Sequence, residues 1–123
     1  VEDVQGYKAD AEDFGVGIAS SRTTPDVSGA LQKCRENGIS TASISCNPGA
    51  PLSAYADFPV EVVVGPEFIT GSTRMKSGTA QKLILNMIST TAMIQIGRVE
   101  DNIMVNMQLT NEKLINRCTK LLM

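Results

Sequence analysis

The sequence predicts an α/β fold built around a parallel β-sheet, and three observations lead to this prediction. Short apolar or β-branched runs at 14–19, 39–46 and 59–64 have the length and composition of strands. Segments with helical character at 26–37 and 52–56 separate these runs along the chain. Strands that alternate with helices normally form parallel sheets. The 123 residues suffice for one globular domain.

The first predicted strand, 14–19, leads through the hydroxyl-rich turn 20–24 into a helix. Pro25 suits the first turn of that helix because proline has no N–H to leave unpaired, and Thr24 can cap it. The pair Asn37-Gly38 supplies a helix stop. The later segment 59–64 is apolar enough for a strand that is buried on both faces.

A long helix is predicted at 75–97, with apolar residues over most of its circumference. Such a helix must be buried on more than one side. We expect it to pack on the sheet and on a second copy of the chain, which predicts a homodimer. A final helix is expected at 111–123 with Thr110 as its N-cap. Residues 98–123 would then be a C-terminal helical extension of one partial domain covering 1–123.

Composition excludes several classes of function. The net charge is −2 with no cluster of either sign, which argues against a nucleic-acid surface. The chain has no histidine, so His-based acid–base catalysis and His-ligated zinc are ruled out within it.

Its three cysteines are far apart and fit free thiols in the reducing cytoplasm. No run is long enough to span a membrane and no signal peptide opens the chain. Because the first residue is Val1, a processed or partial chain is expected.

Two hydroxyl-rich turns follow predicted strands and resemble anion sites. The carboxyl ends of parallel strands and the nearby helix N-termini commonly bind phosphate groups. Glu67 follows the third strand and is a candidate catalytic carboxylate or acceptor for sugar hydroxyls. The alternative is that the hydroxyls only cap helices and that Glu67 has no role. The candidate side chains on the two turns are Ser20, Ser21 and Thr24, and then Ser72, Thr73, Arg74 and Lys76.

Residues 65–90 (GPEFITGSTRMKSGTAQKLILNMIST) resemble the bacterial N-acetylmuramic acid 6-phosphate etherases of the sugar isomerase (SIS) superfamily. Residues 102–117, 44–67 and 17–31 are similar to the same family. The resemblance implies a parallel-sheet, three-layer SIS fold that is incomplete at its N-terminal side, so that the chain corresponds to the C-terminal portion of an etherase.

The resemblance also implies an activity. The family cleaves the D-lactyl ether of a phosphorylated amino sugar, N-acetylmuramic acid 6-phosphate, in cell-wall recycling. The products are N-acetylglucosamine 6-phosphate and D-lactate, and acidic residues run the elimination and hydration without a metal or other cofactor. By this resemblance Glu2 is the candidate acid–base residue, and Ser21 and Thr24 are the best phosphate ligands. Further ligands would be Ser20, Glu67, Ser72, Thr73, Arg74 and Lys76.

The sequence departs from the family in three places, one of which is a spacing between Asp3 and Gly17 that is shorter than the family's. Arg22-Thr23 replaces a Gly-Arg pair, and a side chain at the glycine position hinders close approach of the backbone to phosphate. The family's earlier phosphate turn and second catalytic glutamate are absent from these 123 residues. We therefore expect that the chain does not complete the reaction alone. The alternatives are a non-catalytic phosphosugar-binding regulatory module and a sugar-phosphate isomerase, the latter disfavoured by residues 65–90.

Overall fold

The computed structural model falls into two compact units, Val1–Ile84 and Leu85–Met123. The boundary lies inside a long helix, whereas the sequence places the start of an extension at residue 98; the assignment of one partial domain stays a prediction. The residues that the structure describes are 6, 8–21, 24–105, 108 and 110–121.

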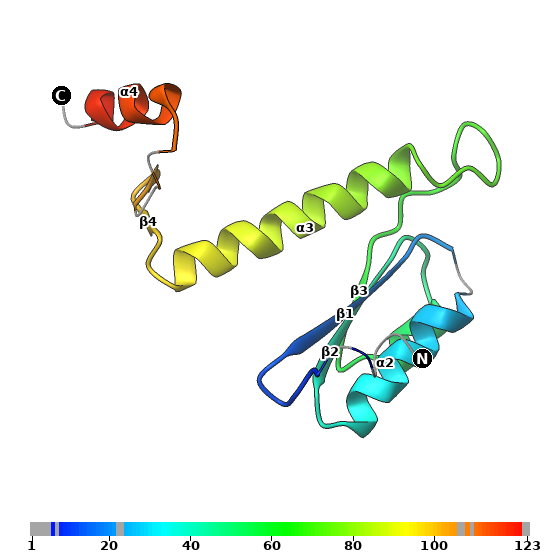
Figure 1. Ribbon diagram of the computed structural model, residues 1–123. Coiled ribbons are helices and arrows are strands. Elements are labelled where there is room, and N and C mark those ends of the chain that lie inside the picture. Colours follow the sequence, from blue (N-terminus) through cyan, green and yellow to red (C-terminus); the bar gives the residue numbers. More distant parts are fainter. Residues whose placement is uncertain (1–5, 7, 22–23, 106–107, 109, 122–123) are drawn as a thin grey trace. The chain divides into compact units, whose positions relative to one another are not determined.

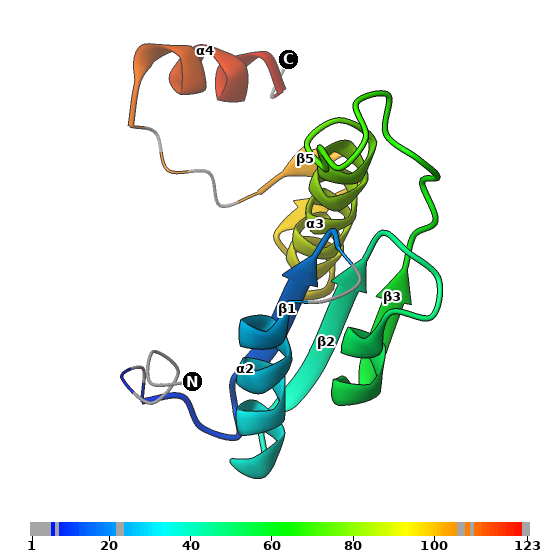
Figure 2. The same cartoon turned by 90° about the vertical axis from the view of Figure 1, so that its right-hand side faces the viewer.

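The first unit contains a three-stranded parallel sheet, which confirms the predicted α/β class. The strands are β1 (Phe14–Ala19), β2 (Ser40–Ser45) and β3 (Phe58–Glu61), in the order β1-β2-β3. Ile18 pairs with Ile44, which in turn pairs with Val60. All three strands therefore end at the same edge of the sheet (Figure 2).

One face of this sheet is covered by α2 (Pro25–Glu36) and the short 3₁₀ helix η1 (Pro51–Tyr55) (Figure 1). Glycines in β1 allow this close packing: a Cβ on Gly17 would lie 2.7 Å from the Leu31 Cδ1 atom. Ala19, Leu31 and Leu52 form the buried cluster between the layers. The helix positions predicted at 26–37 and 52–56 are thus close to those observed.

The opposite face of the sheet carries apolar side chains that are partly exposed on the outer strands β1 and β3. The predicted burial of the third strand on both faces is wrong: among the described residues β3 pairs with β2 alone, and all four residues of β3 are exposed. Phe14 and Phe58 contact each other at this face, with ring centroids 6.0 Å apart. The side chains of Phe14, Val16, Ile18, Phe58 and Val60 are between 36% and 60% exposed.

The ends of α2 agree only partly with expectation. Pro25 is its first residue, and Gly38 beyond its C-terminus has φ 75°, the left-handed conformation that stops a helix. Thr24 makes no capping hydrogen bond with its side chain, which corrects the predicted cap. Its hydroxyl lies 3.2 Å from that of Ser21 instead.

The long helix α3 spans Lys76–Gln95 and lacks the predicted burial on more than one side. Within it only Ser77 and Ile84 are buried, and most of its apolar side chains are exposed. No helix in the described part of the chain is long and apolar enough to cross a membrane.

The second unit contains a hairpin and the last helix. Strands β4 (Val99–Glu100) and β5 (Ile103–Met104) pair antiparallel, and α4 spans Glu112–Leu121. The Asn111 Oδ1 atom accepts the N–H of Leu114 at 3.0 Å. Asn111 therefore caps α4 in place of the predicted Thr110, because its side-chain oxygen reaches the first turn.

Candidate functional site

A pocket of about 180 Å³ lies beyond the carboxyl ends of the strands in the first unit. The residue after β1, the two residues after β2, the loop after β3 and the start of α3 all contribute to it. Both hydroxyl-rich turns therefore contribute to one pocket, through Ser20 and through Thr70 and Thr73. Its lining residues are Ser20, Cys46, Asn47, Val64, Gly65, Pro66, Glu67, Thr70, Gly71, Thr73 and Ser77.

Ser20 is held in place by two amide side chains. The Nδ2 atom of Asn47, which follows β2, donates to the Ser20 carbonyl oxygen at 2.8 Å. The Nε2 atom of Gln81, on α3, donates to the Ser20 hydroxyl oxygen at 2.8 Å. The end of β1 is thereby joined to the loop after β2 and to the second turn of α3.

Glu67 closes the N-terminus of α3. Its Oε2 atom accepts the backbone N–H of Lys76 at 2.9 Å, and its Oε1 atom accepts that of Ser77 at 3.0 Å. A carboxylate at a helix N-terminus satisfies unpaired N–H groups and interacts favourably with the helix dipole. Glu67 therefore occupies the position at this helix where the sequence led us to expect a bound phosphate.

The same contacts set the charge of Glu67. The backbone N–H groups of Ser77 and Lys76 stabilise the carboxylate and hold the pKa of Glu67 below its ordinary value, and the Lys76 ammonium adds to the effect. Glu67 is thus ionised at neutral pH. A carboxylate accepts hydrogen bonds, so this part of the wall suits the hydroxyl or amide groups of a sugar better than a phosphate.

The other predicted site residues that the structure describes lie outside this lining. The hydroxyls of Ser21 and Thr24 face each other. Arg74 donates from its Nε atom to the Ser72 hydroxyl at 2.9 Å, in an exposed part of the loop. Glu2, the candidate acid–base residue, lies outside the described residues.

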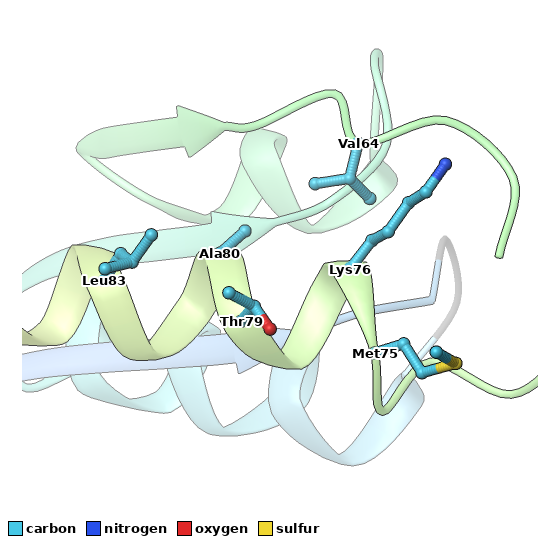
Figure 3. Close-up of a pocket in the computed structure, with 6 residues that line it drawn as sticks. All are labelled: Val64, Met75, Lys76, Thr79, Ala80 and Leu83. Atoms are coloured by element: carbon cyan, nitrogen blue, oxygen red, sulfur yellow. The ribbon is translucent and has the colours of Figure 1, made fainter.

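Lys76 lines a second hollow instead, which shares Val64 with the first pocket. Its Nζ atom donates to the Pro66 carbonyl at 3.0 Å. Figure 3 shows the side chains of Val64, Ala80 and Leu83 in this hollow. Its lining is mainly apolar and also includes Met75 and Thr79.

Sequence reasoning missed three polar residues of the site: Asn47, Ser77 and Gln81. The position of Asn47 could have indicated its role, because it follows the predicted second strand at the edge where ligands bind. Ser77 and Gln81 occupy ordinary positions of the predicted long helix. Their role depends on α3 lying near the end of β1, a contact between residues 61 positions apart.

The fold and the pocket define a class. A parallel α/β domain with hydroxyls, an amide and a helix N-terminus gathered beyond its strands has the architecture of phosphate- and nucleotide-binding domains. Within this class the chain belongs to the SIS domain family, whose pattern matches residues 6–91.

Comparison with relatives of known name narrows the likeness to one kind of SIS protein. The chain is 57% identical over 121 residues to the N-acetylmuramic acid 6-phosphate etherase of Bacteroides thetaiotaomicron. It is 58% identical to that of Porphyromonas gingivalis and 55% identical to that of Lactococcus lactis. These matches cover 98–99% of this chain but 41–44% of the relatives, so the chain spans less than half of their length.

Solved structures support the fold. A putative phosphosugar isomerase from Clostridium difficile matches with a TM-score of 0.67 and 19% identity, over 96% of this chain and 30% of that protein. The sugar isomerase domain of an RpiR transcription factor from Sphaerobacter thermophilus matches with a TM-score of 0.52 and 14% identity, over 79% and 57%. At these identities the likeness shows the predicted SIS fold alone.

Proposed function

We propose that this chain forms the phosphosugar-binding part of an N-acetylmuramic acid 6-phosphate etherase. Such an enzyme cleaves the D-lactyl ether of the sugar and gives N-acetylglucosamine 6-phosphate and D-lactate. The observation that supports this best is the pocket to which both hydroxyl-rich turns contribute, in a chain 54–58% identical to etherases.

Within this proposal, different polar groups of the pocket bind the phosphate and the sugar. The hydroxyls of Ser20 and Thr73 are donors for the phosphate oxygens, because hydroxyl groups donate to anions without adding charge. The carboxylate of Glu67 accepts from sugar hydroxyl or amide groups. Ser21 and Thr24 stay predicted phosphate ligands, and Glu2 stays the predicted acid–base residue.

Binding of the product sugar phosphate tests the site. We expect N-acetylglucosamine 6-phosphate to bind the whole chain more tightly than N-acetylglucosamine in calorimetric titrations. Ser20→Ala and Thr73→Ala should each weaken binding of the phosphorylated sugar about tenfold, since hydrogen bonds to charged groups are the stronger ones. Ser40→Ala is the matched control, because Ser40 is exposed at the amino end of β2. Equal affinity for the two sugars would contradict the proposal.

Release of D-lactate from N-acetylmuramic acid 6-phosphate tests the chemistry. When the part of a relative that the match does not cover is added to the chain, we expect Glu2→Gln to lose lactate release while it keeps sugar-phosphate binding, because the carboxylate would be needed to move a proton. The unaltered chain could instead bind the sugar phosphate tightly and release no lactate, even after addition of the part of a relative that the match does not cover. That result would favour the regulatory module.

We further propose a homodimer formed through α3 and a cytoplasmic location. Exposed apolar side chains along α3 support the dimer, because contiguous apolar surface of this kind commonly marks an interface. The three free cysteines support a reducing compartment.

A further inference from the structure

Ser20 stands out among the pocket residues because both of its polar oxygens are engaged by amide donors. Asn47 donates to its carbonyl oxygen and Gln81 donates to its hydroxyl oxygen, each at 2.8 Å. Ser20 and Gln81 are both partly buried. Ser20 lines the pocket, whereas Gln81 is not among the lining residues.

The bond from Gln81 limits what the Ser20 hydroxyl can do. A hydroxyl group has one proton and two lone pairs. Because the Gln81 N–H group takes one lone pair, the hydroxyl proton must point elsewhere. Within the part of the chain that the structure describes, no side chain or carbonyl accepts this proton. The proton is thus available to an acceptor inside the pocket.

From this geometry we infer that Gln81 is a positioning residue that fixes the Ser20 hydroxyl as a hydrogen-bond donor to an anionic oxygen in the pocket. The inference deepens the proposed function and rests on it. Without Gln81 the hydroxyl rotates among several directions, and an ordered donor becomes a mobile one. With a carboxylate in its place, the hydroxyl turns toward that carboxylate and away from the pocket.

Two nearly isosteric variants separate these effects. Gln81→Met removes the donor and keeps the length of the side chain, and Gln81→Glu replaces the donor with an acceptor. We expect the affinity for N-acetylglucosamine 6-phosphate to fall severalfold in Gln81→Met and about tenfold or more in Gln81→Glu. Gln32→Glu adds the same charge on the exposed side of α2 and should leave binding unchanged.

The preference for the phosphorylated sugar distinguishes positioning from mere stabilisation. A general loss of structure would weaken N-acetylglucosamine 6-phosphate and N-acetylglucosamine alike. We expect Gln81→Glu to lower the ratio of the two affinities, with a urea unfolding midpoint still high enough for a fully folded chain.

A double-mutant cycle completes the test. If Gln81 acts through the Ser20 hydroxyl, Gln81→Met should have almost no further effect on binding in a Ser20→Ala background. Equal losses in the two backgrounds, or an unchanged affinity ratio in Gln81→Glu, would overturn the inference and leave the proposed function standing. A wild-type chain with no preference for the phosphorylated sugar would remove the proposed function itself.

Discussion

At the scale of single residues, three carboxylates among the residues that the structure describes act alike: each accepts backbone or hydroxyl donors from another segment of the chain. Glu67 holds the start of α3, and Glu61 accepts from Gly49, Ala50 and Ser53. Asp57 accepts the N–H and hydroxyl of Thr41. These donors lower the pKa of each carboxyl group, so all three are ionised at neutral pH.

The pH dependence of Glu67→Gln follows from this lowered pKa. A group whose pKa is lower in the folded state stabilises that state above its ordinary value of 4.5, and this stabilisation is lost as the pH falls through the folded value. We therefore expect Glu67→Gln to have a lower urea midpoint than the wild type at pH 7. The difference should shrink below pH 4.5. An equal difference at pH 7 and at pH 3 would contradict this account.

Glu61→Gln provides the matched control for the role of Glu67 in the site. Both carboxylates have a lowered pKa and accept two backbone N–H groups, but Glu61 is absent from the pocket lining. We expect both variants to lose stability at neutral pH. Only Glu67→Gln should also change the affinity for N-acetylglucosamine 6-phosphate, measured by calorimetry under conditions where both variants are folded.

At the scale of elements, the contact between β1 and α2 depends on the absence of a side chain. A Cβ on Gly17 would lie 2.7 and 2.9 Å from two Leu31 atoms and 2.9 Å from the Val27 Cγ1 atom. Contacts this short force the helix away from the strand. We expect Gly17→Ala to lower the free energy of unfolding by about 1–3 kcal/mol in urea titrations. If Gly17→Ala had the same urea midpoint as the wild type, α2 would shift without loss of stability.

Gly78 provides the opposite case. It lies in the first turn of α3, where a Cβ would meet nothing closer than the Thr73 carbonyl at 3.8 Å. Alanine favours the helix over glycine, so Gly78→Ala should raise the free energy of unfolding by about 0.5–1 kcal/mol. A loss of stability in the same urea titration would mean that this turn is packed more tightly than the structure shows.

Local patterns predicted the elements of the first unit well. The β-branched run of β2, Pro25 at the start of α2 and the stop at Gly38 are all encoded within a few neighbouring residues. The helix caps were harder to predict. Thr24 and Thr110 are residue types that often cap helices, but contacts with neighbouring side chains determine which residue forms the capping hydrogen bond. Thr24 faces Ser21, and Asn111 reaches the first turn of α4 before Thr110 can.

The site was less predictable than the elements because it is assembled from distant segments. Because parallel strands end at the same edge of a sheet, the turns after β1 and β3 were expected to lie near each other, and Ser20 and Thr73 do line one pocket. No local pattern indicated that Glu67 would take the N-terminus of α3, or that Gln81 would reach Ser20. Such contacts depend on how α3 lies against the ends of β1 and β2, which is a property of the packed unit.

At the scale of the whole molecule, the proposed sugar-phosphate site does not account for the exposed apolar surface. The outer strands β1 and β3 carry exposed apolar side chains on the face opposite α2, and so does much of α3. Each 100 Å² of such surface is worth about 2.5 kcal/mol when it is buried. A partner surface that covers it would therefore add more stability than any single hydrogen bond described above.

The proposed dimer gives this argument a test. Leu83, Met87 and Ile94 recur along α3 at helical spacing, and their side chains are 52%, 61% and 50% exposed. Met87→Glu would place a charge in the centre of this stripe. If α3 forms the dimer interface, the mass measured by light scattering should fall from that of a dimer to that of a monomer at micromolar concentration.

Ser89 gives the matched control, since Ser89→Glu adds the same charge two positions away, on the side of α3 opposite the stripe. We expect this variant to stay dimeric, because its charge would face solvent and cost no desolvation. A wild-type chain that is monomeric at this concentration would contradict the proposed interface, and so would dissociation by both variants alike. Dissociation by Met87→Glu alone would place the contact along the side of α3 that carries Leu83 and Ile94.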